Sequence, residues 1–421
     1  MLSRLPRRRW LLVGLALALL AALGGAAALY LSLRTPPQGG LVEPTGISVE
    51  TVDTAPLQPP PKPVRPAHDA PCWTEFGGGP HRALSRPDVD LGVPRRSVWV
   101  RGMRDLMEFP PVYCAGRLFV NLERGRTVAV DATTGEVLWS RRSTARMASS
   151  PAISGPNVVV TSFDGTVSAL RQKDGRLVWR LHTDGPVESS PLAIGKTVFV
   201  GATDGRLLAL DAATGKARWV YDFRGRINAS PSVVGSRVCI TTYSGAIGCL
   251  HRASGRRAWL RYFKRDPFRY ESFYSSPSSD GRRLFAVART GRLLALDVRD
   301  GRTLWTYRTG ALTYATIAVS QGRVFTADLG GDVDALRAGD GKLLWRTRVP
   351  GRVLAPCLVV GDLVLFSTLE GRTYAARVSD GRIVWRIRAG KYAPGIATRD
   401  HYFLSLNGLL VSFEGARSRR R

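Results

Sequence analysis

Between residues 97 and 413 the chain alternates short apolar and β-branched runs with turns rich in glycine, aspartate and proline. This pattern predicts many short strands rather than helices. One representative stretch predicts four successive strands: Ser149–Gly155, Val158–Thr161, Thr166–Leu170 and Arg176–Trp179. Turns such as Asp164-Gly165 separate them, because glycine can adopt the positive φ of a tight hairpin. The chain is therefore predicted to be all-β and built from four-stranded units.

A tryptophan ends each of these units: Trp99, Trp139, Trp179, Trp219, Trp259, Trp305, Trp345 and Trp385. Successive tryptophans are 40 residues apart, except for the 46 residues between Trp259 and Trp305. A period near 40 residues in a glycine-punctuated chain is typical of a β-propeller with one four-stranded blade per period. We expect the eight tryptophans to dock each blade on its neighbour.

Other positions of the unit also recur at constant spacing. A turn glycine such as Gly125 is followed four residues later by a small residue such as Ala129, and then by a second turn that opens with Asp131. The aspartate carboxylate can accept hydrogen bonds from the amides that follow it. We expect the small residue to leave room for the indole of a neighbouring copy, so that the tryptophan is buried between blades.

The two ends of the repeat array complement each other. Three strands are predicted after Trp385, at Pro394–Ala397, Tyr402–Leu406 and Leu409–Phe413, without a tryptophan strand of their own. The strand that contains Trp99 has no blade before it. Joining these fragments gives an eight-bladed propeller in which the N-terminal strand closes the last blade and removes exposed sheet edges. A seven-bladed ring with loose ends is the alternative.

The pattern Ala-x-Asp-x-x-Thr-Gly-x-x-x-Trp is complete at Ala129–Trp139 and Ala209–Trp219. It resembles the tryptophan-docking motif of the pyrroloquinoline-quinone-type (PQQ-like) propeller repeats. The segment Trp73–Pro80 resembles the short lead-in found ahead of many such propellers. This resemblance covers roughly residues 72–415 and implies the propeller fold.

Quinone-dependent dehydrogenases share this repeat, and the resemblance implies a site with a quinone stacked on tryptophan, an adjacent cysteine pair, calcium and an aspartate base. No two cysteines of this chain are adjacent: Cys72, Cys114, Cys239, Cys249 and Cys357. Its five histidines show no metal-ligand spacing. We therefore expect no cofactor, no metal site and no catalysis. The chain is similar to the BamB-like branch of the family, which implies binding of partner proteins during outer-membrane assembly.

The N-terminal region predicts a membrane anchor. Residues 1–9 contain four arginines and no acid, and the 24 residues that follow carry no charge. Such a run can span a bilayer, and the positive-inside rule places the basic end in the cytoplasm. A signal peptide cleaved near Gly25–Ala28 is the alternative, although the apolar run exceeds the usual length of one. The expected organisation is a cytoplasmic N-terminus at 1–9, a transmembrane anchor at 10–33, a proline-rich linker at 34–71, the propeller at 72–415 and a basic tail at 416–421.

This organisation places the chain in the plasma (inner) membrane as a single-pass protein with an extracytoplasmic propeller. The linker is expected to be extended and unpaired, because proline disfavours regular pairing. It would hold the propeller away from the membrane.

The chain carries 61 Lys and Arg against 33 Asp and Glu, a formal net charge of +28. A basic extracytoplasmic domain attracts anionic lipid head groups or anionic envelope polymers. Nucleic acid is the other usual partner of a basic protein, but it is not expected outside the cytoplasm. The alternative is a scattered, solvated charge with no particular ligand. We expect a monomer whose partners are envelope proteins, envelope polymers or a lipid surface.

Two pairs of cysteines are candidates for disulfides. Cys239 and Cys249 flank the Ser244-Gly245 turn, which places them nearly opposite each other on adjacent strands. A free buried thiol is the alternative, because Cys249 occupies the small-residue position of its unit. A bridge between Cys72 and Cys114 would join the lead-in to the first blade, but their spacing does not test it.

The extra six residues of the long step fall within Arg261–Tyr274, which connects two blades on one face of the propeller. Aromatic and arginine side chains dominate binding hot spots. The candidate partner-binding loop therefore comprises Tyr262, Phe263, Lys264, Arg265, Phe268, Arg269 and Tyr270. The alternative is that the inner aromatics, Phe273 and Tyr274 among them, pack into the core while the rest covers the blade edge.

The connections between blades are also expected to surround the mouth of the central channel, where propellers commonly bind ligands. The candidate lining residues are Arg146, Glu188, Arg226, Asn228, Glu271, Tyr314, Arg352 and Lys391. Together these features favour a membrane-anchored, extracytoplasmic propeller that acts as a protein-binding or assembly scaffold without catalysis. A PQQ-dependent dehydrogenase or a small-ligand sensor on the same ring is the alternative.

Overall fold

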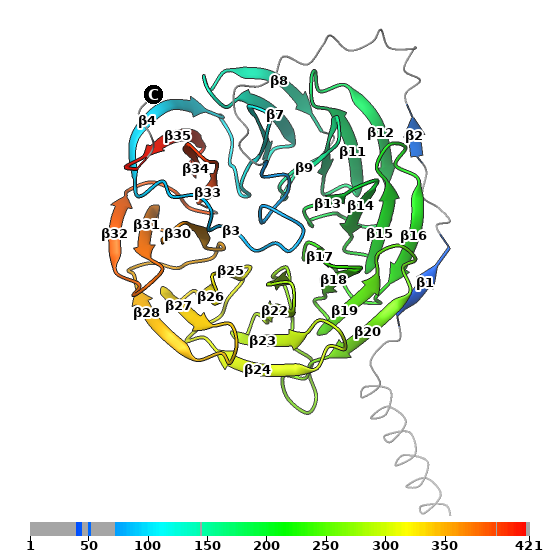
Figure 1. The fold of residues 1–421 in the computed structure, drawn as a ribbon. Helices are drawn as coiled ribbons and strands as arrows, with labels where there is room; N and C mark the ends of the chain where they lie inside the picture. The colour runs from blue at the N-terminus through cyan, green and yellow to red at the C-terminus, as the bar shows by residue number, and fades with distance from the viewer. Residues whose placement is uncertain (1–38, 44–48, 52–71, 144, 393, 418–421) are drawn as a thin grey trace, which may run out of the picture.

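The strands of the molecule form a closed ring of eight sheets (Figure 1). The computed structural model describes residues 39–43, 49–51, 72–143, 145–392 and 394–417. Within these ranges the chain forms strands and no helix. The predicted all-β, eight-bladed propeller is confirmed, and the seven-bladed alternative is wrong.

Each blade contains four antiparallel strands, numbered here from the innermost strand outward. Blades 1 to 4 are β5 (Val112–Cys114), β6 (Arg117–Leu122), β7 (Arg126–Asp131) and β8 (Val137–Arg142); β9 (Ala152–Ser154), β10 (Asn157–Thr161), β11 (Thr166–Arg171) and β12 (Leu177–His182); β13 (Leu192–Ile194), β14 (Thr197–Gly201), β15 (Arg206–Asp211) and β16 (Ala217–Asp222); and β17 (Ser232–Val234), β18 (Arg237–Thr241), β19 (Ala246–His251) and β20 (Arg257–Tyr262). Blades 5 to 8 are β21 (Ser278–Ser279), β22 (Arg283–Val287), β23 (Arg292–Asp297) and β24 (Thr303–Arg308); β25 (Ala318–Ser320), β26 (Arg323–Ala327), β27 (Asp332–Arg337) and β28 (Leu343–Arg348); β29 (Leu358–Val360), β30 (Leu363–Thr368), β31 (Arg372–Arg377) and β32 (Ile383–Ile387); and β33 (Gly395–Ala397), β34 (His401–Leu406), β35 (Leu409–Gly415) and β4 (Pro94–Gly102).

Blade 8 closes the ring with strands from both ends of the propeller. Its outermost strand, β4, pairs antiparallel with β35, and Trp99 lies opposite Ser412. In Figure 1 the cyan β4 lies beside the red β35. Closure in this way leaves no blade with a missing strand, as the sequence pattern predicted.

The tryptophans dock neighbouring blades through one repeated contact. The indole Nε1–H donates to the carbonyl of a residue in the outer turn of the next blade, as Trp99 does to Ala132 at 3.0 Å. The same bond, at 2.8–3.0 Å, is formed by Trp139, Trp179, Trp219, Trp259, Trp305 and Trp345. Trp385 faces blade 8, whose third and fourth strands are not joined by a turn, and packs against the apolar core there.

The small residue of each unit lies beside the indole of its own blade, so the expectation of a neighbouring copy is wrong. Ala129 pairs with Trp139 across two adjacent strands of blade 1, and Phe119 pairs with Ala129 on the other side. The rings of Phe119 and Trp139 are 5.9 Å apart between centroids. The indole therefore lies across the short alanine side chain while its edge reaches the next blade.

In blade 4 cysteines occupy the positions of Phe119 and Ala129, and the tryptophan, Trp259, is retained. Cys239 and Cys249 form a disulfide, and Cys249 lies opposite Trp259 in the sheet register. Both cysteines are fully buried. A second disulfide joins Cys72 to Cys114 on β5. Burial raises the pKa of the remaining Cys357 thiol to about 12.

Part of the predicted linker pairs with the propeller, so the expectation of unpaired backbone is wrong for six of its residues. Strands β1 (Gly40–Val42) and β2 (Val49–Thr51) add a fifth strand to the outer edges of blades 3 and 2, against β16 and β12. They lie outside the ring in Figure 1. No helix in the described ranges is long and apolar enough to cross a membrane. The predicted anchor at 10–33 and the tail residues 418–421 lie outside those ranges.

Two turn glycines provide a test of blade docking. Gly135 has φ +73°, and a Cβ there would lie 2.6 Å from the Trp99 ring, whereas Gly116 has φ +76° with no atom within 4 Å. We expect Gly116→Ala to cost about 1 kcal/mol from its left-handed backbone. Gly135→Ala should cost roughly 1–3 kcal/mol more, because the methyl group overpacks the joint. Urea unfolding of both variants measures the difference, and equal losses would contradict the docking role.

The disulfides should differ in their resistance to reduction. Cys72 and Cys114 are half-buried, whereas Cys239 and Cys249 are fully buried, with Cys249 opposite Trp259 on the adjacent strand. A thiolate must reach the sulfur that it attacks. Under native conditions dithiothreitol should reduce Cys72–Cys114 first, and Cys239–Cys249 only after unfolding. Alkylation followed by peptide mass spectrometry measures the order, and early labelling of Cys239 would contradict it.

Candidate functional site

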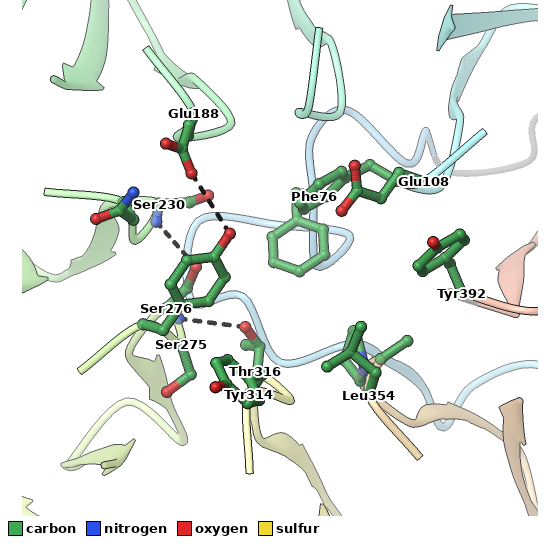
Figure 2. Close-up of a pocket in the computed structure, with 15 residues that line it drawn as sticks. Phe76, Glu108, Glu188, Ser230, Ser275, Ser276, Tyr314, Thr316, Leu354 and Tyr392 are labelled. Carbon is green, nitrogen blue, oxygen red and sulfur yellow. Dashed lines mark hydrogen bonds between the residues drawn. The ribbon is translucent and has the colours of Figure 1, made fainter. Parts of the chain in front are cut away.

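The connections between blades lie at one end of the ring, together with the turns that join the second and third strands of each blade. The amide of Phe163 in such a turn donates to the carbonyl of Arg146 in the preceding connection at 2.9 Å. The same bond joins Tyr243 to Arg226. We call this end the connection face. A cavity of about 340 Å³ lies at its centre, and we call it the central pocket (Figure 2).

The walls of the central pocket come from one equivalent position in the connections. This position lies two residues before the serine, threonine or proline at 110, 150, 190, 230, 276, 316, 356 and 394, which precedes each innermost strand. It is occupied around the ring by Glu108, Ala148, Glu188, Asn228, Tyr274, Tyr314, Leu354 and Tyr392. All of these except Ala148 line the pocket. The residue just before this position is buried in seven connections, as Met147, Val187 and Ile227 are, and is the exposed Lys391 in the eighth.

A chain of hydroxyl groups joins the blades beneath these walls. The amide of Ser150 donates to the Ser190 hydroxyl at 3.0 Å, and the amide of Ser190 donates to the Ser230 hydroxyl at 2.9 Å. In the same way the amide of Ser230 donates to the Ser276 hydroxyl at 2.9 Å, and the amide of Ser276 donates to the Thr316 hydroxyl at 3.2 Å. It thus ties together the innermost strands of five blades, and Figure 2 shows its last two bonds.

The floor of the pocket is a segment that crosses the centre of the ring. This central segment, residues 73–86, appears as the blue trace inside the ring in Figure 1. Its carbonyl groups accept hydrogen bonds from amides of the innermost strands. The carbonyl of Thr74 accepts from the amide of Ile153 at 2.7 Å, and that of Pro80 from the amide of Val233 at 2.7 Å. It ends in β3 (Ser85–Arg86), which pairs parallel with β29. Phe76 of this segment lines the pocket. The expected channel is therefore closed on one side.

Arg82 fixes the central segment at the centre of the molecule. Its side chain is fully buried and donates to the carbonyls of Phe76, Ser190, Pro191 and Pro231 at 2.5–3.2 Å. Burial lowers the pKa of Arg82 to about 9, so the guanidinium is charged at neutral pH. Carbonyl dipoles from two blades stabilise this charge where water cannot.

The pocket itself is acidic and aromatic. The Tyr274 hydroxyl donates to a Glu188 carboxylate oxygen at 3.4 Å, and the Tyr274 ring contacts the Tyr314 ring edge-on at 5.6 Å. Burial and the nearby Glu188 and Glu108 raise the pKa of Tyr274 well above its usual range, so its hydroxyl keeps its proton. Burial also raises the pKa of Glu108. No lysine or arginine is among the described residues that line the cavity.

Some of the residues predicted for the channel mouth line the central pocket, and others are exposed at its rim. Glu188, Asn228 and Tyr314 line the central pocket. Arg146, Arg226 and Arg352 lie two positions further from the strands and are exposed at the rim, where Arg146 pairs with Glu123 and Arg352 with Glu370. Lys391 lies at the rim with its Nζ 5.8 Å from the centre of the Tyr392 ring.

Glu271 is not at the mouth, and that prediction is wrong. Its side chain is buried, and it accepts a hydrogen bond from the Thr290 hydroxyl at 2.8 Å. The sequence prediction missed Glu108, Tyr274, Leu354 and Tyr392 as pocket residues. Counting back two residues from the serine, threonine or proline that precedes each innermost strand would have found them, because this spacing is the same in all eight units.

The candidate partner-binding loop forms a short hairpin on the connection face. Lys264 and Tyr270 form an antiparallel bridge, and the Asp266 carboxylate accepts the amides of Phe268 and Arg269 at 2.9 Å. Phe263 packs edge-on against the buried Phe273, at 6.1 Å between ring centroids.

The two expectations for this loop each describe part of it. Phe263 and Phe273 pack into or against the core, and Tyr262 contacts Tyr270. Phe268 at the tip is 81% exposed. Lys264, Arg265 and Arg269 around it are also exposed. The tip thus presents one exposed aromatic ring among basic side chains, and the stem of the hairpin is packed against the core.

Comparisons with known proteins agree on the fold. The family model described as outer membrane protein assembly factor BamB matches residues 95–307 and 308–416, which is more than half of the chain. Among solved structures, BamB from Moraxella catarrhalis is 18% identical, with a TM-score of 0.63 over 77% of this chain and 99% of that one. No curated protein matches this sequence.

Dehydrogenases with the same fold are also similar to this chain. A europium-containing methanol dehydrogenase is 14% identical, with a TM-score of 0.69 over 79% of this chain and 87% of that one. The quinohemoprotein alcohol dehydrogenase from Comamonas testosteroni is 13% identical, with a TM-score of 0.70 over 83% of this chain and 82% of that one. At these identities the likeness concerns the fold alone.

The central pocket does not fit the quinone cofactor that the resemblance to dehydrogenases implies. Pyrroloquinoline quinone carries carboxylates, and these would meet Glu108 and Glu188 without a lysine or arginine among the lining residues. The repeat tryptophans are engaged between blades rather than in the pocket. Among the described residues, no group of three His, Cys, Asp or Glu side chains is placed to hold a metal ion.

Removing the Arg82 side chain tests the role of the central segment. Arg82→Ala leaves four buried carbonyls without their donor and Glu75 without its nearby positive charge. We expect a loss of about 3–5 kcal/mol in the free energy of unfolding. Arg176→Ala, at a side chain that is 77% exposed, is the matched control and should change stability by less than about 0.5 kcal/mol. Similar small losses from both variants in urea unfolding would refute this role.

Proposed function

The chain belongs to the family of the outer membrane protein assembly factor BamB, and on that premise we propose that it is a non-catalytic scaffold of the cell envelope. In this role the propeller binds other envelope proteins through its connection face. The anchor at residues 10–33 holds it in the plasma (inner) membrane, with the N-terminus in the cytoplasm and the propeller outside. The chain acts as a monomer.

The observation that carries this proposal is the hairpin at residues 264–270. Its tip exposes Phe268 to solvent, while Phe263, Phe273 and Glu271 fix its base. An exposed phenylalanine on a rigid support loses little conformational entropy when a partner covers it. The neighbouring Arg265 and Arg269 add the side-chain type that is enriched in binding hot spots.

An extracytoplasmic location is supported by the two disulfides, Cys72–Cys114 and Cys239–Cys249. Such bonds persist in oxidising compartments and are rare in the cytosol. The net charge of +28 would draw the propeller toward anionic lipid or envelope polymers as secondary partners, rather than toward nucleic acid.

A small-ligand sensor is the second candidate function, and the central pocket is the observation that favours it. A cavity of about 340 Å³ is large enough for a small molecule. A PQQ-dependent dehydrogenase is not favoured, because the acidic walls of this cavity do not suit an anionic quinone. Cofactor absorbance and dye reduction after addition of quinone and calcium to the purified protein would overturn the non-catalytic proposal.

The hairpin tip can be tested without disturbing the fold. In the full-length protein we expect Phe268→Ala to reduce cross-linking to envelope proteins at least several-fold, because truncating a hot-spot aromatic weakens binding strongly. Quantitative mass spectrometry after cross-linking in cells measures the loss. Phe263 is unsuitable for this test because its ring packs against the core.

Val100→Ala is the matched control, since Val100 is also an exposed apolar side chain, 55% accessible on the outer strand β4. It should leave the cross-linked proteins unchanged. If Phe268→Ala also leaves them unchanged while the protein remains folded, the hairpin does not bind partners.

A further inference from the structure

The walls of the central pocket differ in charge from the rest of the molecule. The chain has 61 basic side chains against 33 acidic ones, yet the described residues that line the cavity include two glutamates and no base. Both glutamates occupy the equivalent position in their connections, where other blades have tyrosine, asparagine, leucine or alanine. The acidity of the cavity therefore comes from this one position of the connections, in the two blades where it is glutamate.

Aromatic rings complete the walls. Tyr274 and Tyr314 contact each other edge-on, and Phe76 of the central segment contacts Phe109 in the same way at 5.9 Å. In Figure 2 Phe76, Tyr314 and Tyr392 surround the hollow, with Glu108 and Glu188 at its edge. Faces of aromatic rings carry negative potential, and they attract cations most strongly where water is excluded.

Three bases lie near the walls, but none of them lines the cavity: the Arg82 guanidinium is 5.5 Å from the centre of the Phe76 ring, the Lys391 Nζ is 5.8 Å from that of Tyr392, and Arg146 is at the rim. The guanidinium of Arg146, which lowers the pKa of Glu108, is itself paired with Glu123 at 2.5 Å. Its effect is smaller than that of burial, which raises the same pKa and so disfavours the charged form of Glu108 unless a cation lies beside it. Glu188 receives a neutral donor, the Tyr274 hydroxyl. A cation inside the cavity would lie beside both carboxylates, where the described lining has no base.

We propose that the central pocket binds a small organic cation, an ammonium or guanidinium group held between the tyrosine rings and the carboxylates of Glu108 and Glu188. The cavity of about 340 Å³ suits a group of that size. The cation is either a free small molecule or the basic side chain of a partner protein, and the chemistry of recognition is the same. This site is independent of the hairpin, so it stands or fails separately from the scaffold role.

Calorimetric titration of the full-length protein tests the site with matched probes. Choline and N-methylguanidinium should bind, whereas 3,3-dimethyl-1-butanol, a neutral molecule with nearly the shape of choline, should bind at least roughly tenfold more weakly. N-acetylarginine amide distinguishes the two sources: binding tighter than that of the free cations indicates a partner side chain, and weaker binding indicates a free molecule. Equal binding of choline and its neutral analogue would overturn the proposal.

Single substitutions then locate the site. Glu188→Gln keeps an oxygen that can accept the Tyr274 hydroxyl but removes the charge, and should weaken choline binding roughly tenfold. Tyr314→Leu should also weaken it by removing a ring. Glu136→Gln, at an exposed turn residue, is the matched control and should leave the affinity unchanged. Circular dichroism confirms folding of each variant. Unchanged affinity in Glu188→Gln, or no heat with any cation up to about 20 mM, would refute the site.

Discussion

The structure depends on the contact between the indole of one blade and the turn glycine of the next. The turn glycines have positive φ, and a Cβ on them would lie 2.5–2.7 Å from the docked indole. Only glycine therefore allows the ring to lie against the backbone while its Nε1–H reaches a carbonyl of the same turn. Because the same atoms meet at successive joints, the blades repeat with nearly constant geometry. One position of each connection is then directed toward the axis, and the central pocket results.

The central segment makes this ring a closed structure with a cavity at one face. It exchanges hydrogen bonds with innermost strands of six blades and is held by Arg82. A buried guanidinium is unfavourable unless its donors are satisfied. Here the ring itself supplies the acceptors, the carbonyls of Ser190, Pro191 and Pro231, which lie together only when blades 3 and 4 are docked. The floor of the pocket and the packing of the ring thus depend on each other.

Two features that distinguish this ring lie on the same connection face. The hairpin at 264–270 presents Phe268 among bases, and the central pocket presents tyrosines among acids. The hairpin tip is basic and the pocket is acidic, so the two places suit ligands of opposite charge. Tyr274 follows the hairpin in the same connection and lines the pocket, so only residues 271–273 separate the hairpin from the pocket wall.

The sequence by itself determined the strands, the number of blades and the closure by Trp99, because periodicity and turn residues act over a few neighbouring positions. It also indicated Glu188, Asn228 and Tyr314, although it grouped them with rim arginines and with the buried Glu271. Only the tertiary structure decided which side chains face the axis, since residues of different blades meet only after the ring has closed. The same holds for the course of the central segment and the pairing of β1 and β2. Each depends on contacts between segments far apart in the chain, for which local pattern carries no signal.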